Sequence, residues 1–124
     1  MNQRRKRVTD AETLAYQCVK VCEGRKARDV VLFDVRESSV LADFYLVCTG
    51  SSEPQIRAIA HHLAEELAEA GLRTRLEGRA ESRWVVMDSG VVVIHVMDPA
   101  LRAYYRLEEL WDPAQIVYRS PEAP

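Results

Sequence analysis

Residues 84–97 have the sequence WVVMDSGVVVIHVM, in which two apolar runs flank Ser89 and Gly90. Two such runs around a short Gly-containing loop predict a β-hairpin. A two-residue loop at Ser89 and Gly90 places Asp88 opposite Val91 and Trp84 opposite His95. We therefore expect two strands of a β-sheet here, and the rest of the chain can be placed around them.

The two faces of the predicted hairpin differ, because side chains alternate along a strand. One face is purely apolar and is expected to face the core; it consists of Val85, Met87, Val92, Ile94 and Val96. The other face carries Trp84, Val86, Asp88, Val91, Val93, His95 and Met97. An uncovered Trp on this face would be a binding hot spot, whereas a helix packed over it would make Trp84 part of the core. The pattern leaves both interpretations open, and a bulge would change the register.

Three further strands are predicted before the hairpin. Residues 30–33 and 44–48 are continuous apolar runs, typical of strands buried on both faces. Between Leu72 and Glu77 apolar or neutral residues alternate with charged ones, which predicts a half-exposed strand near a sheet edge. The expected sheet therefore has about five strands.

Helices are predicted around these strands from capping residues and apolar stripes. Thr9 is the expected N-cap of the first helix, in a capping box with Glu12, and Gly24 its expected end. Ser52 and Gln55 form a second capping box, and that helix is expected to end at Gly71. A last helix is expected to follow Asp98 and to end at Pro113. The order α-β-β-α-β-β-β-α predicts one α/β domain with a mixed sheet and flanking helices.

The last predicted helix is apolar on more than one face. Its apolar residues are Leu101, Tyr104, Tyr105, Leu107, Leu110 and Trp111. A helix with this pattern has to be buried on two sides. Contact with a partner molecule, a homodimer contact, or a short break that lets both halves pack inward would each satisfy the pattern.

Length and composition predict a single domain. The chain has 124 residues, is 48% hydrophobic and 29% charged, and has a net charge of −2. We expect a flexible basic N-terminus over 1–8, the domain over 9–118 and a flexible tail over 119–124. The basic run Arg4–Arg7 is either a solvated terminus or an arm that contacts RNA phosphates. Near-balanced charge argues against a sequence-independent nucleic-acid binder.

Three cysteines, without a signal peptide or an apolar run of membrane-spanning length, predict a cytoplasmic protein with no membrane partner. Cys18 and Cys22 are expected to be small buried hydrophobic residues, because no ligand pair lies near them at zinc-site spacing. Cys48 belongs to an apolar strand.

No motif predicts catalysis, a cofactor or a metal. Thr49-Gly50-Ser51-Ser52 could hold a phosphate at a helix N-terminus, which would suit a nucleotide-handling enzyme, or could simply cap that helix. Asp34, Asp43 and Asp88 flank strands without forming a close pair, and His61 and His62 point about 100° apart on a helix. We therefore predict that the protein is not an enzyme and acts by binding a macromolecule.

Five ordered blocks resemble the ribosomal silencing factor family, also called RsfS or Iojap. They are DFYLVCTGSS at 43–52, EG at 77–78, WVVMDSG at 84–90, VIHV at 93–96 and YRLEELW at 105–111. The match runs from about Asp10 to Trp111. Two local departures are Gly90-Val91, where the family usually has Gly-Asp, and Trp111-Asp112-Pro113, where it often has Trp-Gly-Asp.

The resemblance implies a nucleotidyltransferase-like fold that lacks the catalytic acids. It also implies binding to the large ribosomal subunit through large-subunit ribosomal protein fourteen, which blocks joining of the small subunit and lowers translation when nutrients are short. The family's interface tryptophan corresponds to Trp84, and neighbouring contacts carry over onto His95, Met97, Tyr105 and Leu107. No cofactor, metal or DNA is implied, and a binding surface of this kind can form a homodimer when the partner is absent.

Overall fold

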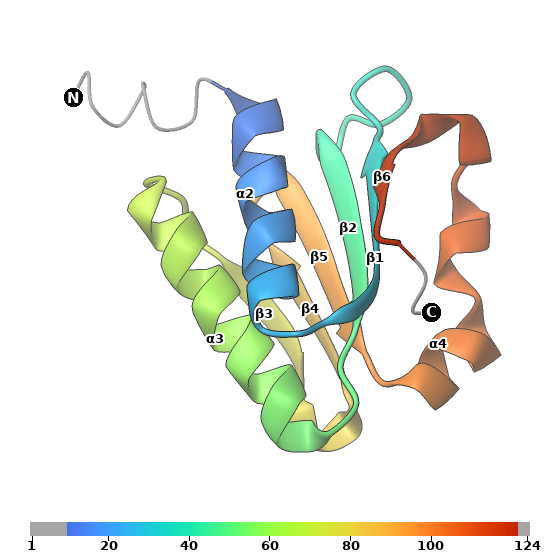
Figure 1. Ribbon diagram of the computed structural model, residues 1–124. Coiled ribbons are helices and arrows are strands. Elements are labelled where there is room, and N and C mark those ends of the chain that lie inside the picture. Colours follow the sequence, from blue (N-terminus) through green and yellow to red (C-terminus); the bar gives the residue numbers. More distant parts are fainter. Residues whose placement is uncertain (1–9, 122–124) are drawn as a thin grey trace.

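A six-stranded sheet with the order β3-β4-β5-β2-β1-β6 forms the centre of the computed structural model, which describes residues 10–121 (Figure 1). Its strands are β1 (Arg28–Asp34), β2 (Phe44–Thr49), β3 (Arg75–Arg79), β4 (Trp84–Asp88), β5 (Val92–Met97) and β6 (Ile116–Arg119). β2 and β5 are parallel, and every other neighbouring pair is antiparallel. The predicted α/β class and mixed sheet are confirmed, with one strand more than expected.

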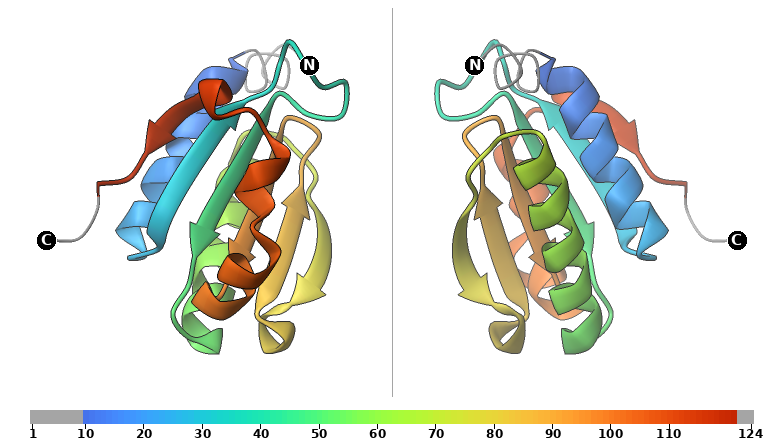
Figure 2. Two further views of the ribbon diagram at one scale, coloured as in Figure 1. Left: turned by 90° about the vertical axis from the view of Figure 1, so that its right-hand side faces the viewer. Right: turned by 90° about the vertical axis from the view of Figure 1, so that its left-hand side faces the viewer.

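Helices cover both faces of the sheet (Figure 2). α2 (Ala11–Gly24) and α3 (Glu53–Glu69) pack side by side on one face. The opposite face carries α4 (Pro99–Tyr105) and the short 3₁₀ helices η2 (Leu107–Leu110) and η3 (Pro113–Gln115). A further 3₁₀ turn, η1 (Ala80–Ser82), joins β3 to β4.

The main core lies between the sheet and the pair α2 and α3. It includes the apolar hairpin face predicted from the sequence, namely Val85, Met87, Val92, Ile94 and Val96, all of which are buried. Cys18, Cys22 and Cys48 are buried in the same core, as expected for small hydrophobic residues. Burial raises the pKa of the Cys18 thiol to about 12, which keeps it protonated.

The start of α2 differs from the predicted one, whereas the ends of α2 and α3 agree with prediction. The N-cap of α2 is Asp10, whose carboxylate accepts from the Thr13 amide at 3.0 Å, and not Thr9, which lies outside the described residues. α2 ends at Gly24 as predicted, and the left-handed turn follows two residues later at Lys26, with φ 64°. The end of α3 agrees with prediction, because Gly71 takes φ 86° directly after the C-cap.

The hairpin has a different register from the one predicted. Trp84 pairs with Met97, Val86 with His95 and Asp88 with Val93. The loop is shifted by one residue, from Ser89 and Gly90 to Gly90 and Val91. Hydrogen bonds between Ser89 and Val92 close it. Gly90 is the first residue of the turn and has φ 83°, the positive value that this position needs. Moving the loop by one residue moves the pairing by two, and a shift of two leaves every side chain on its predicted face.

The strand predicted from Leu72 lies further along the chain. β3 begins at Arg75, and all five of its residues are exposed rather than alternately buried. Its position at the edge of the sheet is as predicted. Gly78 has φ 78°, and a Cβ there would lie 2.3 Å from the carbonyl oxygen of Trp84, so this close approach of β3 to β4 requires glycine.

The C-terminal segment breaks after α4, as in one of the alternatives that the sequence left open, although Tyr104 and Leu110 remain exposed. Arg106 has φ 48° and ends the helix, so that η2 turns back onto the sheet. The predicted flexible tail from residue 119 is wrong at its start: Arg119 ends β6, and Ser120 exchanges hydrogen bonds with Val30 in β1. Residues 1–8 and the basic run at 4–7 lie outside the described residues.

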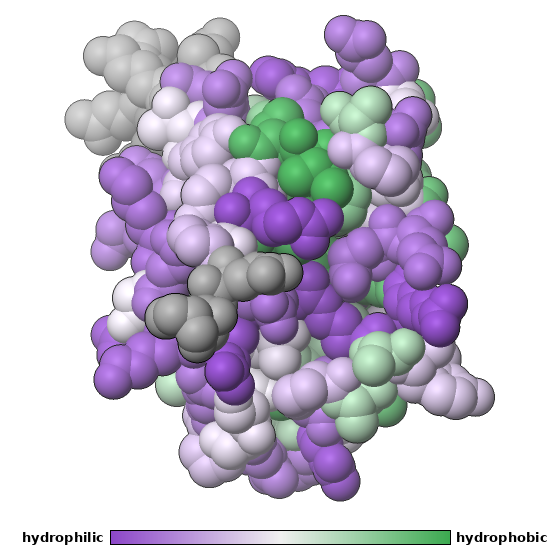
Figure 3. All heavy atoms as spheres, turned by 45° about the vertical axis from the view of Figure 1, so that its right-hand side comes forward, coloured by the Kyte–Doolittle hydropathy of each residue, from purple (hydrophilic) through white to green (hydrophobic). Residues whose placement is uncertain are grey.

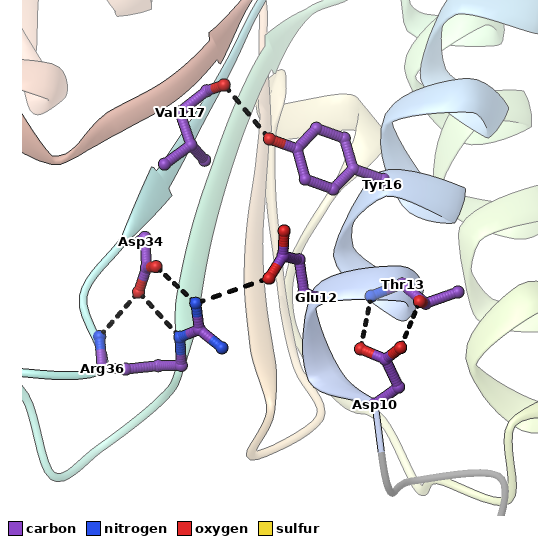
Figure 4. A network of polar contacts seen from close by, with 7 residues as sticks. All are labelled: Asp10, Glu12, Thr13, Tyr16, Asp34, Arg36 and Val117. Atoms are coloured by element: carbon purple, nitrogen blue, oxygen red, sulfur yellow. Dashed lines mark hydrogen bonds and ion pairs between the residues drawn. The ribbon is translucent and has the colours of Figure 1, made fainter.

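Side-chain contacts tie the start of α2 to β1 and β6 (Figure 4). The Tyr16 hydroxyl donates to the carbonyl of Val117 at 3.1 Å. Arg36 binds both carboxylate oxygens of Asp34, at 3.0 and 2.7 Å, and reaches Glu12 at 3.7 Å. Hydrogen bonds from Arg36 hold the pKa of Asp34 below its ordinary value. Within residues 10–121 we find no helix with the length and hydrophobicity needed to cross a bilayer.

Candidate functional site

Six aromatic and imidazole rings form a continuous row on the sheet face opposite α2 and α3. This aromatic row consists of Phe33, Tyr45, Trp84, His95, Tyr105 and Trp111. At its inner end Trp111 stacks on Tyr45, with ring centroids 4.5 Å apart, and contacts Phe33 at 5.1 Å. Phe33 belongs to a second buried cluster with Val31, Val35 and Val47, and Tyr45 and Trp111 pack against this cluster.

The outer end of the aromatic row reaches the molecular surface. Trp84 is half-buried, and its indole Nε1–H donates to Nδ1 of His95 at 3.1 Å. The Tyr105 ring lies over it with a centroid separation of 5.0 Å, and Tyr105 is itself 53% exposed. The structure therefore answers the question left by the pattern: a helix covers Trp84 in part, and an edge of the cluster remains accessible.

More apolar side chains extend this surface along the C-terminal segment. Tyr104 is 77% exposed and Leu110 is 72% exposed, although neither is among the contact residues predicted from the family resemblance. Their signal in the sequence was the apolar pattern on more than one helix face. Part of this side of the molecule is visible in Figure 3, where compact hydrophobic patches are surrounded by mostly hydrophilic residues.

Two other predicted contact residues lie deeper. Met97 pairs with Trp84 across the hairpin but is fully buried, so it supports Trp84 from the sheet and has no exposed surface. Leu107 is partly buried and packs against the second core cluster, close to Trp111. Of the five predicted residues, Trp84, His95 and Tyr105 come together in one partly exposed cluster, and Met97 and Leu107 lie beneath or beside it.

Four polar contacts hold α4 in the position that places Tyr105 over Trp84. The Asp98 carboxylate caps α4 by accepting from the Leu101 amide at 2.8 Å, and it also binds Arg83 at 3.2 Å. Arg102 has a side chain only 10% exposed; it donates to Thr49 Oγ1 at 2.8 Å and binds Glu108 at 3.0 Å. Arg102 thereby joins α4 to β2 and to η2.

His95 is neutral in the folded protein. Burial lowers its pKa from the ordinary 6.5 to about 4. Because Nδ1 accepts the Trp84 N–H, a proton on the neutral ring belongs on Nε2. A second proton would have to displace the Trp84 bond, so protonation opposes the observed arrangement of the cluster.

This pKa shift predicts a loss of stability in mild acid. Between pH 6.5 and 4 the unfolded chain binds a proton at His95 that the folded chain does not. The free energy of unfolding should therefore fall by about 2 kcal/mol through this window, after allowance for partial exposure. Urea unfolding of the wild type and of His95→Gln, whose amide can accept from Trp84 without titrating, measures the difference. An identical pH dependence of the two proteins would contradict the assignment.

The Thr49–Ser52 turn uses its own polar groups internally. Thr49 Oγ1 accepts from Arg102, and Ser52 caps α3 by accepting from the Gln55 amide at 3.2 Å. Gln55 in turn accepts from the Ser51 amide at 2.6 Å, one residue earlier than in the predicted capping box. The turn therefore acts as a helix cap in this structure.

The predicted strand-end carboxylates also have local partners. Asp34 binds Arg36, and Asp88 accepts from the Gly90 amide at 2.9 Å. His61 and His62 both contact Glu65 on the surface of α3. Within the part of the chain that the structure describes, no group of three His, Cys, Asp or Glu side chains could hold a metal ion.

These features define an α/β protein with a mixed sheet, one closed apolar face and one aromatic face that remains partly open. The family model described as "Ribosomal silencing factor during starvation" matches residues 8–123. The chain therefore belongs to the ribosomal silencing factor family, as the sequence resemblance indicated.

Individual relatives agree with this assignment. A ribosomal silencing factor from Halalkalibacterium halodurans is 43% identical over 107 residues, which cover 86% of this chain and 92% of the relative. A crystal structure of a Chromobacterium violaceum protein has a TM-score of 0.77 and 34% identity, covering 82% of this chain and 86% of that one. A mouse relative named "Mitochondrial assembly of ribosomal large subunit protein 1" is 29% identical over 97 residues. The matched region covers 75% of this chain and 42% of the mouse protein.

Proposed function

We propose that this protein binds the large ribosomal subunit through large-subunit ribosomal protein fourteen and sterically prevents the small subunit from joining. In this role it lowers translation by binding alone, without chemistry of its own, a cofactor, a metal, DNA or a membrane. It acts in the cytoplasm, and its free form can pair with a second copy through the same surface.

The observation that carries the proposal is the half-buried Trp84 beside Tyr105 at the open end of the aromatic row. Tryptophan and tyrosine that are fixed by neighbours and partly exposed are the side chains that dominate protein–protein interfaces. Here a hydrogen bond to His95 and the overlying Tyr105 hold the indole in place, so little side-chain entropy is lost on binding. Membership of the ribosomal silencing factor family and the name of the mouse relative support a ribosomal large-subunit partner.

Co-sedimentation with purified ribosomal subunits tests the proposal. The protein should sediment with large subunits and remain in the supernatant with small subunits. Adding it to large subunits before small subunits should lower the fraction of joined ribosomes. Sedimentation with neither subunit would refute the proposed function, and binding that leaves subunit joining unchanged would refute the steric mechanism.

A further inference from the structure

A second surface lies at the opposite edge of the sheet from β6, along the outer side of β3. Within the described residues β3 pairs only with β4, so its other edge carries backbone groups without a strand partner. All five residues of β3 are exposed. An open edge of this kind can be extended by another strand.

An apolar pocket of about 420 Å³ opens beside this edge, between α3 and the strands β3 and β4. Its apolar lining is Ala60, Ala64, Leu76, Ala80, Val85 and Met87. The small side chains of α3 leave the space open, and Leu76 is 60% exposed at its mouth. An added strand could place apolar side chains in this pocket.

The opposite face of β3 is basic. Arg75 and Arg79 alternate with Leu76 and Gly78 along β3, with Glu77 between them, and Arg79 also contributes to the lining of the pocket. None of the ion pairs within residues 10–121 includes Arg73, Arg75 or Arg79. The edge therefore presents an apolar side and a side with unpaired positive charge.

We propose that the outer edge of β3 is a docking site for an extended, acidic segment of a partner protein. The segment adds a strand beside β3, with alternate apolar side chains in the pocket and the intervening carboxylates next to Arg75 and Arg79. Cross-strand neighbours on one face interact directly, so the alternation along β3 favours a segment in which apolar and acidic residues also alternate.

A second copy of the chain fits this edge less well. Antiparallel pairing of two β3 strands about Glu77 would put Arg75 opposite Arg79 on one face and Glu77 opposite Glu77. Like charges directly opposite each other destabilise a strand pair. The charge pattern therefore favours an acidic partner over self-association.

The arginines of the β3 edge adjoin the surface proposed for ribosome binding, because Arg79 pairs with Trp84 and shares its face of the sheet. Val85 and Met87 of β4 face the pocket, whereas Trp84 faces the aromatic row on the other side of the sheet. The pocket and the aromatic row therefore lie on opposite faces of the sheet, and the two proposed surfaces meet at Arg79 and Trp84.

A designed peptide tests the docking site on the full chain. The probe is a short peptide in which polar residues alternate with valine, with glutamates at the positions beside Arg75 and Arg79 and threonine at the position beside Glu77. A peptide with lysines in place of the glutamates is its charge control. Titration with the acidic probe should shift the NMR signals of the Arg75–Arg79 amides and leave those of Ile116–Arg119 in place. Leu76→Lys and the pair Arg75→Glu with Arg79→Glu should each weaken binding more than about tenfold, and the charge-reversed pair should prefer the lysine peptide.

A matched variant shows whether peptide binding depends on the β3 edge itself. Arg119→Glu reverses a charge on the other edge strand and should bind the acidic peptide like the wild type. No shift of the β3 amides at a peptide concentration of about 1 mM would overturn the proposal. So would tighter binding of a single-stranded RNA oligonucleotide at β3, or dimerisation that Leu76→Lys abolishes.

Discussion

Replacing Trp84 with glutamate is expected to weaken binding to large ribosomal subunits by more than about a hundredfold while the protein stays folded. The indole is the fixed, partly exposed centre of the proposed interface, between His95 and Tyr105. The substitution removes its apolar area and places a charge that a partner would have to desolvate. Co-sedimentation over a range of protein concentrations measures the change, and thermal unfolding checks the fold.

Two variants serve as controls for this result. Leu41→Glu adds the same charge at another exposed apolar residue, in the loop between β1 and β2, and should bind like the wild type. Trp84→Phe keeps an aromatic ring but loses the hydrogen bond to His95, and should have intermediate affinity. Wild-type binding by Trp84→Glu would remove Trp84 from the interface.

Replacing Arg102 with methionine is expected to lower the free energy of unfolding by roughly 3 kcal/mol. Its nearly buried guanidinium binds Glu108 and Thr49, and also the carbonyl of Asp29. Without it Glu108, which is only 29% exposed, loses its counter-charge, and α4 loses its links to β1, β2 and η2. Denaturant unfolding measures the loss.

Variants of neighbouring residues distinguish the buried pair from a general effect of charge. Arg106→Met removes a highly exposed partner of Glu109 and should change stability by less than about 0.5 kcal/mol. Adding Glu108→Leu to Arg102→Met should recover part of the loss, because the unpaired carboxylate is removed as well. A loss for Arg102→Met no larger than that for Arg106→Met would contradict the structural role of Arg102.

The sequence correctly predicted those strands and helix ends that depend on neighbouring residues in the chain. The apolar runs at 30–33 and 44–48 form buried strands, and Ser52 and Gly71 begin and end α3 as expected. The two faces of the hairpin were also correct although its register was not, because a two-residue shift preserves alternation. Gly90 rather than Ser89 is the first residue of the turn because that position needs a positive φ. The pattern of apolar residues carries no information about backbone angles.

The sequence pattern missed β6, which depends on contacts with residues far away in the chain. β6 is only four residues long and exists because it pairs with β1, far away in the sequence. Hydrogen bonds between Ser120 and Val30 extend that contact beyond the predicted domain boundary. A short strand has little signal of its own, since its stability comes from the partner strand.

The sequence by itself determined the class of fold, the apolar face of the hairpin and membership of the family, since these depend on residue types in chain order. Only the tertiary structure decided that Trp84 is half-covered, that Met97 is buried beneath the candidate surface, and that the β3 edge is open and basic. The break at Arg106 folds η2 onto the sheet and leaves Tyr105 over Trp84. Exposure is the sum of contacts between segments distant in the sequence, so alternation could assign Trp84 to a face but could not show how much of that face remains open.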